Sequence, residues 1–229
     1  MRTVGMLGGM SWESTAIYYR LANELTRERQ GGLHSAPILL HSFDFAPIEE
    51  LQVAGEWERA GRLLADAAAR LEQAGAELLV LCTNTMHLVA PQIESAVDIP
   101  LLHIIDATAS CVRAQGMSKI GLLATGFTME QPFYAERMAS LGVDCLVPEA
   151  DDRAEVHRII YDELCQGIVR EESRAAYRDV ITRLVDRGAE GIVLGCTEVE
   201  MLIGADDSPV PVFPTTALHV EAAIDAALA

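Results

Sequence analysis

Short apolar runs alternate with longer amphipathic segments along almost the whole chain. Several runs are nearly continuous in aliphatic residues, such as LLVLC at 78–82 and GIVLGC at 191–196, which is typical of strands buried on both faces. Eight runs predict strands: Thr3–Leu7, Pro37–Ser42, Leu78–Cys82, Leu101–Ile104, Lys119–Ala124, Asp144–Val147, Gly191–Cys196 and Val210–Phe213.

The segments between these runs have helical periodicity. The clearest helical segments are Ser14–Arg29, Trp57–Gln73, Gln131–Leu141, Arg174–Arg187 and Ala217–Leu228. Gly75, Gly142 and Gly188 follow three of them, where a glycine commonly ends a helix. Because strands and helices alternate, we expect an α/β fold built on parallel sheets.

The chain also contains two copies of one unit. MRTVGMLGGM at 1–10 resembles MSKIGLLATG at 117–126, and GAELLVLCTNT from Gly75 resembles GAEGIVLGCTE from Gly188 at a similar spacing. The repeat predicts two pseudo-symmetric lobes, each with a mostly parallel four-stranded sheet flanked by helices. The N-terminal lobe would comprise 1–100 plus 215–229, and the C-terminal lobe 101–214. An active site is expected in the cleft between them, at the carboxyl ends of both sheets.

Composition and charge narrow the range of partners. The chain has 17 Lys and Arg against 34 Asp and Glu, a net charge of −17, which disfavours nucleic acid and anionic membrane surfaces. No apolar run reaches the roughly 18 residues of a membrane helix, and the first ten residues do not have the pattern of a secretory signal. We therefore expect a cytoplasmic protein that binds a small molecule and keeps its thiols reduced.

Two of the five cysteines occupy the same place in the two copies. Cys82 and Cys196 each end a predicted strand and precede a threonine, Thr83 or Thr197, and the chain has no CxxC pair. A buried cysteine is often only a small apolar residue. We interpret three cysteines in that way: Cys111, Cys145 and Cys165.

Two thiols on opposite sides of one pocket suit a particular chemistry. Inversion at a carbon acid removes a proton from one face and returns a proton to the other, and a thiol with a pKa of about 8.5 can serve both steps. A helix N-terminus after each strand would favour the thiolate. Pyridoxal phosphate needs a Schiff-base lysine, and the only lysine, Lys119, begins a strand away from the expected site. A cofactor-independent reaction is therefore favoured.

The loop Gly8-Gly9-Met10-Ser11 follows the first strand and precedes a helix. Its glycines allow backbone N–H groups to approach an anion, although the sequence is neither a GxGxxG nor a Walker motif. We expect this loop, with the hydroxyls of Thr83 and Thr197, to hold a substrate carboxylate. The alternative is that the glycines only form a tight turn. The six histidines lack metal-ligand spacing, so no metal site is predicted.

The chain carries four further motifs: GGMSWEST (8–15), VLCTNTMH (80–87), PEAD (148–151) and GCTE (195–198). Together they resemble the aspartate/glutamate racemase family, and in particular its broad-specificity amino-acid racemases. The resemblance implies a cofactor-independent, commonly homodimeric isomerase with Cys82 and Cys196 as catalytic residues. Cys196 would take the proton from the L-isomer and Cys82 from the D-isomer. The resemblance also implies that six residues line the substrate: Met10, Ser11, Asn84, Thr85, Thr125 and Thr197.

Two features depart from the family pattern. Dedicated glutamate racemases usually read GCTH, whereas this chain has Glu198, which either orients the substrate ammonium or begins a helix. Many aspartate racemases carry basic residues where this chain has Gln52 and Cys165. A neutral or hydroxylated side chain could therefore be accepted, because Gln52 can donate a hydrogen bond to either kind. His87, shortly after Cys82, either tunes that thiol or has a surface or capping role.

Two other functions remain open on the sequence. The scaffold could support a maleate-type cis–trans isomerase or a decarboxylase, although a decarboxylase of this kind needs only one such cysteine. A non-catalytic amino-acid-binding protein would use both cysteines for packing alone. The second Cys-Thr pair favours racemisation over these alternatives.

Overall fold

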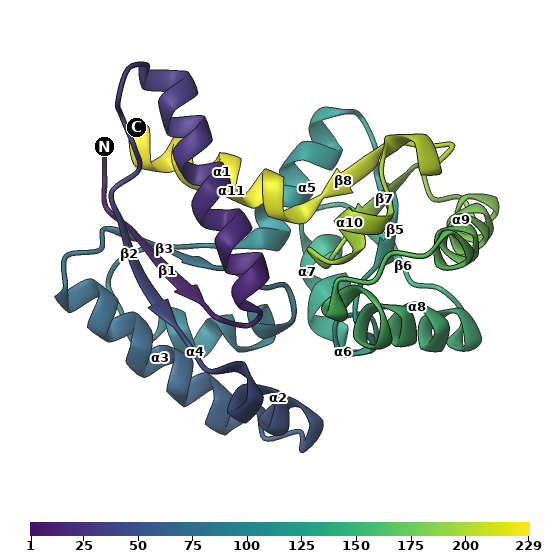
Figure 1. The fold of residues 1–229 in the computed structure, drawn as a ribbon, viewed down its shortest axis with the longest axis horizontal. Helices are drawn as coiled ribbons and strands as arrows, with labels where there is room; N and C mark the ends of the chain where they lie inside the picture. The colour runs from purple at the N-terminus through teal and green to yellow at the C-terminus, as the bar shows by residue number, and fades with distance from the viewer. The chain divides into compact units, whose positions relative to one another are not determined.

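The computed structural model describes all 229 residues and divides them into two lobes (Figure 1). The N-terminal lobe comprises Met1–Ile104 and His219–Ala229, and the C-terminal lobe comprises Ile105–Leu218. The repeat predicted these boundaries at 100 and 215. The chain passes from one lobe to the other twice, after Ile104 and after Leu218.

The N-terminal lobe is built on a parallel sheet with the strand order β2-β1-β3-β4. Its strands are β1 (Val4–Gly8), β2 (Ile38–Ser42), β3 (Leu78–Leu81) and β4 (Leu101–Leu102). Leu7 pairs with His41 on one side and with Leu81 on the other, so the carboxyl ends of these strands meet at one edge. That edge is where parallel sheets present their functional loops.

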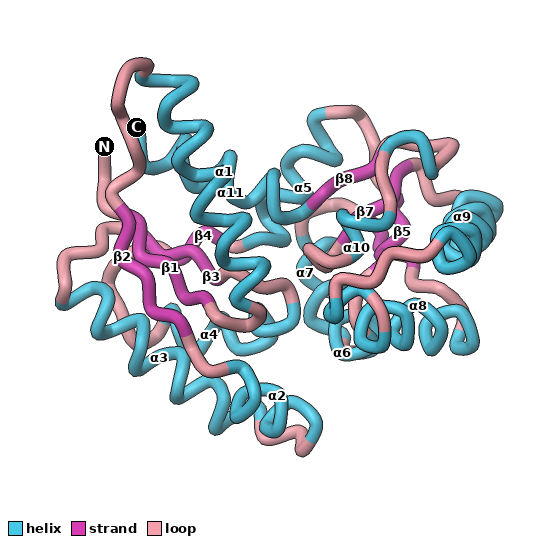
Figure 2. Tube along the Cα trace, viewed as in Figure 1, coloured by secondary structure: helices cyan, strands magenta, loops and turns pink.

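Helices cover both faces of this sheet (Figures 1 and 2). They are α1 (Trp12–Gln30), α2 (Phe45–Val53), α3 (Trp57–Gln73), α4 (Ala90–Glu94) and α11 (Thr215–Leu228), with a 3-10 turn η1 (Thr85–Val89). Tyr18 of α1 and Ile224 of α11 pack with Met6 on one face. Leu64 of α3 packs with Leu79 on the other, which makes every strand position of β1 and β3 buried, as their aliphatic sequences predict.

The C-terminal lobe repeats this plan with the strand order β6-β5-β7-β8, again all parallel. Its strands are β5 (Lys119–Leu123), β6 (Asp144–Leu146), β7 (Gly191–Leu194) and β8 (Val212–Pro214). Its helices are α5 (Ile104–Ala114), α6 (Gly126–Glu130), α7 (Pro132–Ser140), α8 (Ala150–Asp162), α9 (Glu171–Asp186) and α10 (Val199–Leu202), with 3-10 turns η2 (Leu164–Gln166) and η3 (Ala205–Asp207). Each strand order follows from the other by adding four, so the two sheets have the same topology. The predicted fold class is confirmed.

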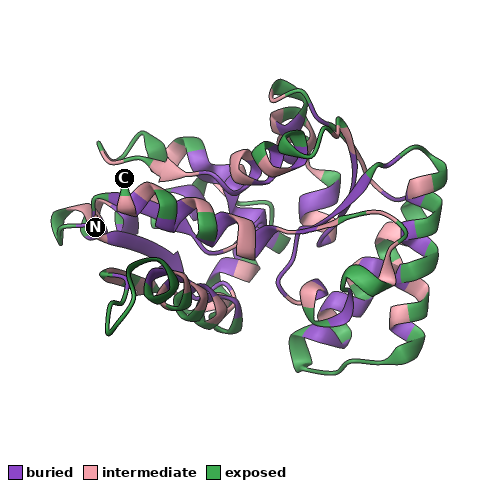
Figure 3. Cartoon of the chain, turned by 90° about the horizontal axis from the view of Figure 1, so that it is seen from above, coloured by how far each residue is buried: buried purple, intermediate pink, exposed green.

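Three glycines end helices as the sequence predicts. Gly75, Gly142 and Gly188 follow α3, α7 and α9 with φ angles of 101°, 79° and 96°. Glycine adopts this left-handed backbone without the steric cost that a Cβ atom brings. In Figure 3 the central strands and the inward helix faces are buried, while the outward helix faces are exposed. None of these helices has the length and apolar character that crossing a membrane requires.

The predicted strands are correct in number and position but too long at some carboxyl ends. β3 ends at Leu81 and β7 at Leu194, so Cys82 and Cys196 lie just beyond their strands rather than at the last position. β4 has only two residues, because the chain turns into α5 at Ile104. Strand pairing ends where the neighbouring strand ends. Leu81, the last residue of β3, pairs with Leu7, the last residue but one of β1.

Candidate active site

Cys82 is fixed at the carboxyl edge of the N-terminal sheet through its main chain. Its N–H donates to the Leu7 carbonyl at 2.9 Å, and its own carbonyl accepts a hydrogen bond from the Ser14 hydroxyl at 3.4 Å. The side chain is fully buried, and this burial raises the pKa of the Cys82 thiol. Cys82 is therefore held as the thiol in this environment.

Cys196 lies at the equivalent edge of the C-terminal sheet, but its side chain has a charged partner. The Gly195 N–H donates to the Leu123 carbonyl at 2.8 Å, and the Cys196 thiol donates to Glu198 Oε2 at 2.9 Å. Burial raises the pKa of Cys196, and the charge and hydrogen bond of Glu198 raise it further. The carboxylate is placed to receive the proton of this thiol.

A second carboxylate follows Glu198 along the same segment. Glu200 in α10 accepts a hydrogen bond from the Thr216 N–H at 3.3 Å. Burial raises the pKa of Glu200 to about 7, and the charge of Glu198 adds to the rise. Glu198 stands immediately before α10, as one of its two predicted roles required. Its contact with the Cys196 thiol was not predicted, and contact with a substrate ammonium stays a prediction.

Two predicted substrate residues cap helices at matching positions in the two lobes. Ser11 precedes α1, and its hydroxyl accepts from the Ser14 N–H at 3.3 Å. Thr125 precedes α6, and its hydroxyl accepts from the Thr128 N–H at 3.4 Å. Each hydroxyl satisfies a first-turn donor that would otherwise lack a helical partner. These caps fix the start of the helix that follows the first strand of each lobe.

The glycine loop after β1 is tightly packed. A Cβ atom on Gly9, which has a φ of 87°, would lie 2.3 Å from the Phe43 carbonyl oxygen, and one on Gly8 would lie 2.5 Å from Thr15 Cγ2. The Gly9 N–H already donates to Thr15 Oγ1 at 2.8 Å. The tight turn therefore accounts for both glycines. Capture of a carboxylate by the remainder of this loop stays a prediction.

A buried cluster of three histidines lies behind the Cys82 loop. His87 Nδ1–H donates to the Thr83 carbonyl at 2.8 Å, and His87 Nε2 accepts from the Ile104 N–H at 3.2 Å. The ring of His87 lies 4.5 Å from that of His103 and 5.7 Å from that of His219, centroid to centroid. His87 is buried, so the surface role considered for it is wrong. It holds the loop that follows Cys82.

His219 completes this cluster from α11. Its Nε2–H donates to the Leu102 carbonyl at 2.7 Å, and its Nδ1 accepts from the Tyr18 hydroxyl at 2.9 Å. Burial lowers the pKa of His219 to about 4, although the hydrogen bond to Leu102 opposes this shift. No sequence pattern indicates the cluster, because its members come from three separate segments of the chain.

The remaining predicted residues separate into two groups. The N-terminal edge carries five of them around Cys82: Met10, Ser11, Thr83, Asn84 and Thr85. The C-terminal edge carries three around Cys196: Thr125, Thr197 and Glu198. Gln52 is buried in α2, and its Nε2 donates to Met86 Sδ at 3.0 Å, so its amide lies against the apolar core. Contact of Gln52 with a substrate stays a prediction.

The packing role predicted for Cys165 is wrong. This cysteine lies in η2 and is exposed, so it does not serve as a packing residue, whereas Cys111 and Cys145 are partly buried. Cys165 is close enough to Cys196 to contribute to its raised pKa. The contact between η2 and α10 places Cys165 near the candidate site.

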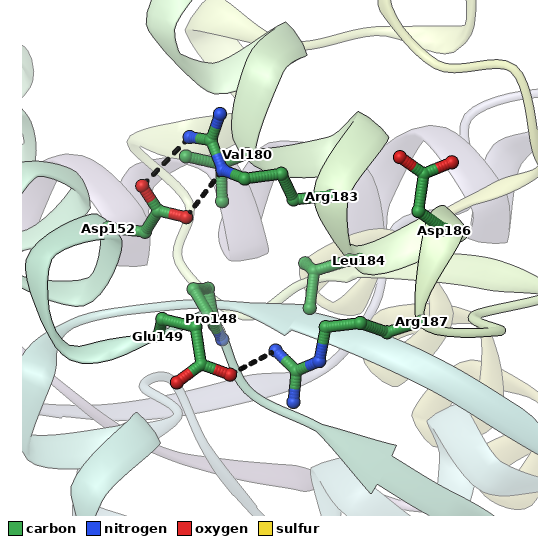
Figure 4. Close-up of a pocket in the computed structure, with 8 residues that line it drawn as sticks. All are labelled: Pro148, Glu149, Asp152, Val180, Arg183, Leu184, Asp186 and Arg187. Atoms are coloured by element: carbon green, nitrogen blue, oxygen red, sulfur yellow. Dashed lines mark hydrogen bonds and ion pairs between the residues drawn. The ribbon is translucent and has the colours of Figure 1, made fainter.

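A surface pocket between α8 and α9 is separate from these loops (Figure 4). Its walls carry two ion pairs, Arg183 with Asp152 at 2.7 Å and Arg187 with Glu149 at 3.3 Å. None of the predicted site residues lines it. No group of three or more His, Cys, Asp or Glu side chains is arranged to hold a metal ion.

Comparison with known proteins identifies the family. The chain matches the model of the Asp/Glu/Hydantoin racemase family over residues 7–223. The broad-specificity amino-acid racemase RacX of Bacillus subtilis (strain 168) is 21% identical, over 99% of this chain and 98% of its own.

Two solved structures are similar over 100% of both chains. A candidate Asp/Glu racemase from Yersinia pestis is 53% identical with a TM-score of 0.95, and an aspartate racemase homologue from Pyrococcus horikoshii OT3 is 33% identical with a TM-score of 0.88. The resemblance inferred from the sequence motifs is confirmed. The chain is an isomerase that belongs to the Asp/Glu/hydantoin racemase family.

Proposed function

We propose that this isomerase interconverts L- and D-amino acids without a cofactor, using Cys82 and Cys196 as its two bases. One observation carries the proposal. The two thiols lie at topologically equivalent points, just beyond β3 and β7, and each is followed by a threonine. Racemisation needs a proton acceptor on one face of the α-carbon and a proton donor on the other.

The carboxylate beside Cys196, which has no counterpart beside Cys82, supports a direction for the first turnover. The Cys196 proton passes to Glu198 Oε2, 2.9 Å away, and the resulting thiolate removes the α-proton. The electron pair of the broken C–H bond stays on the substrate and delocalises into its carboxylate. The Cys82 thiol then donates its proton to the opposite face. Burial of Cys82 keeps that proton in place until the carbanion forms.

The substrate carboxylate needs hydrogen-bond donors, because negative charge accumulates there as the carbanion forms. We assign it to the start of α1 around Ser11 and to the hydroxyls of Thr83 and Thr197. The helix dipole of the 19-residue α1 favours an anion at this end. These donors belong to the same edges as the two thiols, which supports their joint use.

The position of the single lysine supports a cofactor-independent reaction. Lys119 is the first residue of β5, at the amino end of the strand, whereas the Cys196 loop follows the carboxyl end of the paired strand β7. A Schiff base at Lys119 would lie at the wrong edge of the sheet for this loop. The acidity of the α-carbon must then come from the hydrogen bonds to the carboxylate.

Solvent exchange tests the proposal. The purified protein is incubated under reducing conditions in D₂O with a panel of L-amino acids and no added cofactor. Proton NMR follows loss of the α-proton, and chiral chromatography follows the enantiomer. We expect exchange accompanied by inversion.

Two outcomes would contradict the proposal. Activity on maleate with no exchange of any amino acid would favour the cis–trans isomerase. Slow, equal alkylation of Cys82 and Cys196 by iodoacetamide, again without exchange, would favour a binding protein.

A further inference from the structure

The segment that carries Cys196 and Glu198 is joined to α10 by its own main chain. The Val199 N–H donates to the Cys196 carbonyl at 3.1 Å, and the Met201 N–H donates to the Glu198 carbonyl at 3.1 Å. Glu198 already has helical backbone angles, with φ −66° and ψ −35°. Leu202, the last residue of α10, stands four residues later and therefore on the same side of the helical turn. A group that holds Leu202 thus also fixes the direction in which the Glu198 side chain leaves the chain.

Two arginines of α9 hold this end of α10. Arg174 Nη1 donates to the Leu202 carbonyl and also to Asp207 Oδ2, the latter at 3.1 Å. Arg178, one turn later in α9, donates through Nε to Asp207 Oδ1 at 2.8 Å. Asp207 Oδ2 also accepts from the Gly204 N–H at 2.9 Å. We call Arg174, Arg178 and Asp207 the α9 clamp, because together they bind α9 to the end of the Cys196 segment.

The α9 clamp is charged and largely shielded from water. The side chain of Asp207 is 7% exposed and that of Arg174 is 24% exposed. Burial favours a higher pKa for Asp207, but hydrogen bonds from Gly204 and Arg178 and the charges of both arginines hold that pKa below its usual value. Asp207 therefore stays ionised at neutral pH. Loss of either partner would leave a mostly buried charge without its counter-ion.

α9 is itself anchored, so it can serve as a support for the clamp. The buried Tyr177 hydroxyl donates to the Val156 carbonyl of α8 at 3.2 Å. The Ser173 hydroxyl donates to Glu163 Oε2, at the end of α8, at 2.5 Å. These two contacts flank Arg174 along α9. The arginine therefore projects from a helix whose position is set by α8.

The Cys82 loop is held in a different way. His87 belongs to that loop, is buried, and donates to the Thr83 carbonyl at 2.8 Å. The equivalent residue after Cys196 is Met201, which is 46% exposed. The C-terminal loop thus lacks the internal histidine of the N-terminal loop, and the α9 clamp takes its place.

We propose that Arg174 is a positioning residue that directs Glu198 toward the Cys196 thiol, and that Asp207 holds Arg174 in place. The inference rests on the proposed racemisation, in which Glu198 receives the Cys196 proton. Arg174 acts on the main chain at Leu202 and not on the thiol itself. Loss of the clamp should therefore slow the proton transfer more than it weakens substrate binding.

Steady-state kinetics test this role. Arg174→Met removes the donors, and we expect kcat for racemisation to fall about tenfold with KM changed by less than about twofold. Adding Arg174→Met to Glu198→Gln should lower kcat no further, because the clamp then has no carboxylate to direct. Asp207→Asn weakens the clamp without removing it and should give a smaller loss with the same dependence on Glu198. Losses that multiply in the double variant would show that Arg174 serves only the fold, and would overturn the inference.

Alkylation of the two thiols tests the inference without relying on activity. A displaced Glu198 raises the pKa of Cys196 less, so iodoacetamide should modify Cys196 at lower pH in Arg174→Met, while Cys82 in the same molecule is unchanged.

Arg183→Met is the matched control for both measurements. It removes an ion pair between the same helix and Asp152, away from the Cys196 segment (Figure 4), and should change neither kcat nor the two thiols. An unchanged Cys196 profile in Arg174→Met, or an equal shift at both thiols, would overturn the inference. Racemisation of no amino acid by the natural chain would refute the proposed function, whereas the alkylation profiles would still decide whether Arg174 positions Glu198.

Discussion

The loop after β3 and the loop after β7 occupy the same place in two sheets of the same topology, yet they hold their cysteines differently. Cys82 is fixed through main-chain hydrogen bonds, and burial alone raises the pKa of its thiol. Cys196 instead donates its thiol proton to Glu198. The repeated backbone supplies two equivalent thiols, and the side chains around them supply different routes for a proton.

The sequence positions next to the two cysteines explain this difference. Asn84 stands two residues after Cys82, where Glu198 stands two residues after Cys196. His87 stands five residues after Cys82 and is buried, where the equivalent Met201 is 46% exposed. The N-terminal loop is therefore secured by a histidine cluster, and the C-terminal loop carries the proton acceptor. Position in the repeat places the two thiols at equivalent points, whereas their neighbours set the pKa of each thiol.

Replacing either cysteine should have the largest effect. Cys82→Ser and Cys196→Ser each remove one base and should lower kcat for racemisation by about 10³-fold, within the range for loss of a general acid or base. Cys111→Ser, at a partly buried thiol in α5, is the matched control and should retain activity. Chiral chromatography measures all three variants. A rate above a tenth of normal in either the Cys82 or the Cys196 variant would contradict an equal role for the two loops.

The histidine cluster should make stability depend on pH. The fold keeps His219 neutral down to a pKa of about 4, whereas the unfolded chain binds this proton near pH 6.5. The contribution of His219 is fully present above pH 6.5 and is lost as the pH falls from 6.5 to 4, by about 3 kcal/mol. Urea unfolding at several pH values measures it.

His219→Gln is the control for this prediction. It replaces the imidazole with a group that does not titrate, so the decrease in unfolding free energy between pH 6.5 and 4 should be smaller than in the natural chain. Identical pH profiles for the two proteins would show that His219 is not kept neutral by the fold.

Removing the acid beside Cys196 should have a smaller effect on the rate. Glu198→Gln keeps the size of the side chain and removes the proton acceptor, and racemisation should fall about ten- to a hundredfold. Because the charge and hydrogen bond of Glu198 raise the pKa of Cys196, the variant should alkylate Cys196 at lower pH. Mass spectrometry of iodoacetamide adducts measures each thiol. An equal shift at Cys82 would contradict the assignment of Glu198 to one thiol.

The helix caps should give the smallest and most symmetric effect. Ser11→Ala and Thr125→Ala each remove a hydroxyl that accepts a first-turn N–H, and each should cost about 1 kcal/mol of unfolding free energy. Thermal unfolding compares them. A much larger loss for one of them would show that the two caps are not equivalent, despite their matching places in the two lobes.

Much of the fold was predictable because it depends on local pattern and on the repeat. Aliphatic runs such as Leu78–Leu81 are buried on both faces only in a sheet that helices cover on both sides. Glycines such as Gly75 mark helix ends because glycine adopts a positive φ without steric cost. The repeat alone places Cys82 and Cys196 at equivalent positions of the two lobes. Strand ends were less accurate, because a strand stops where its neighbour stops.

The details of the candidate site were less predictable, because they depend on contacts between distant segments. Nothing in the sequence indicates that His219 contacts His87, or that the Gln52 amide donates to Met86 Sδ. Cys165 was interpreted as a packing residue because its segment has helical character, but η2 leaves it exposed. Glu198 lies only two residues from Cys196, yet its side-chain direction is set by how the chain enters α10.

The position of deuterium early in the reaction tests the two-base account most directly. An L-amino acid that is exchanged at its α-position is incubated in D₂O, and both enantiomers are separated before about a tenth has reacted. Two separate thiols predict that the D-product carries deuterium while the remaining L-substrate keeps its proton, since the donor thiol exchanges with solvent and the acceptor thiol lies on the other face. Deuterium entering the remaining substrate as fast as the product would contradict two opposed bases.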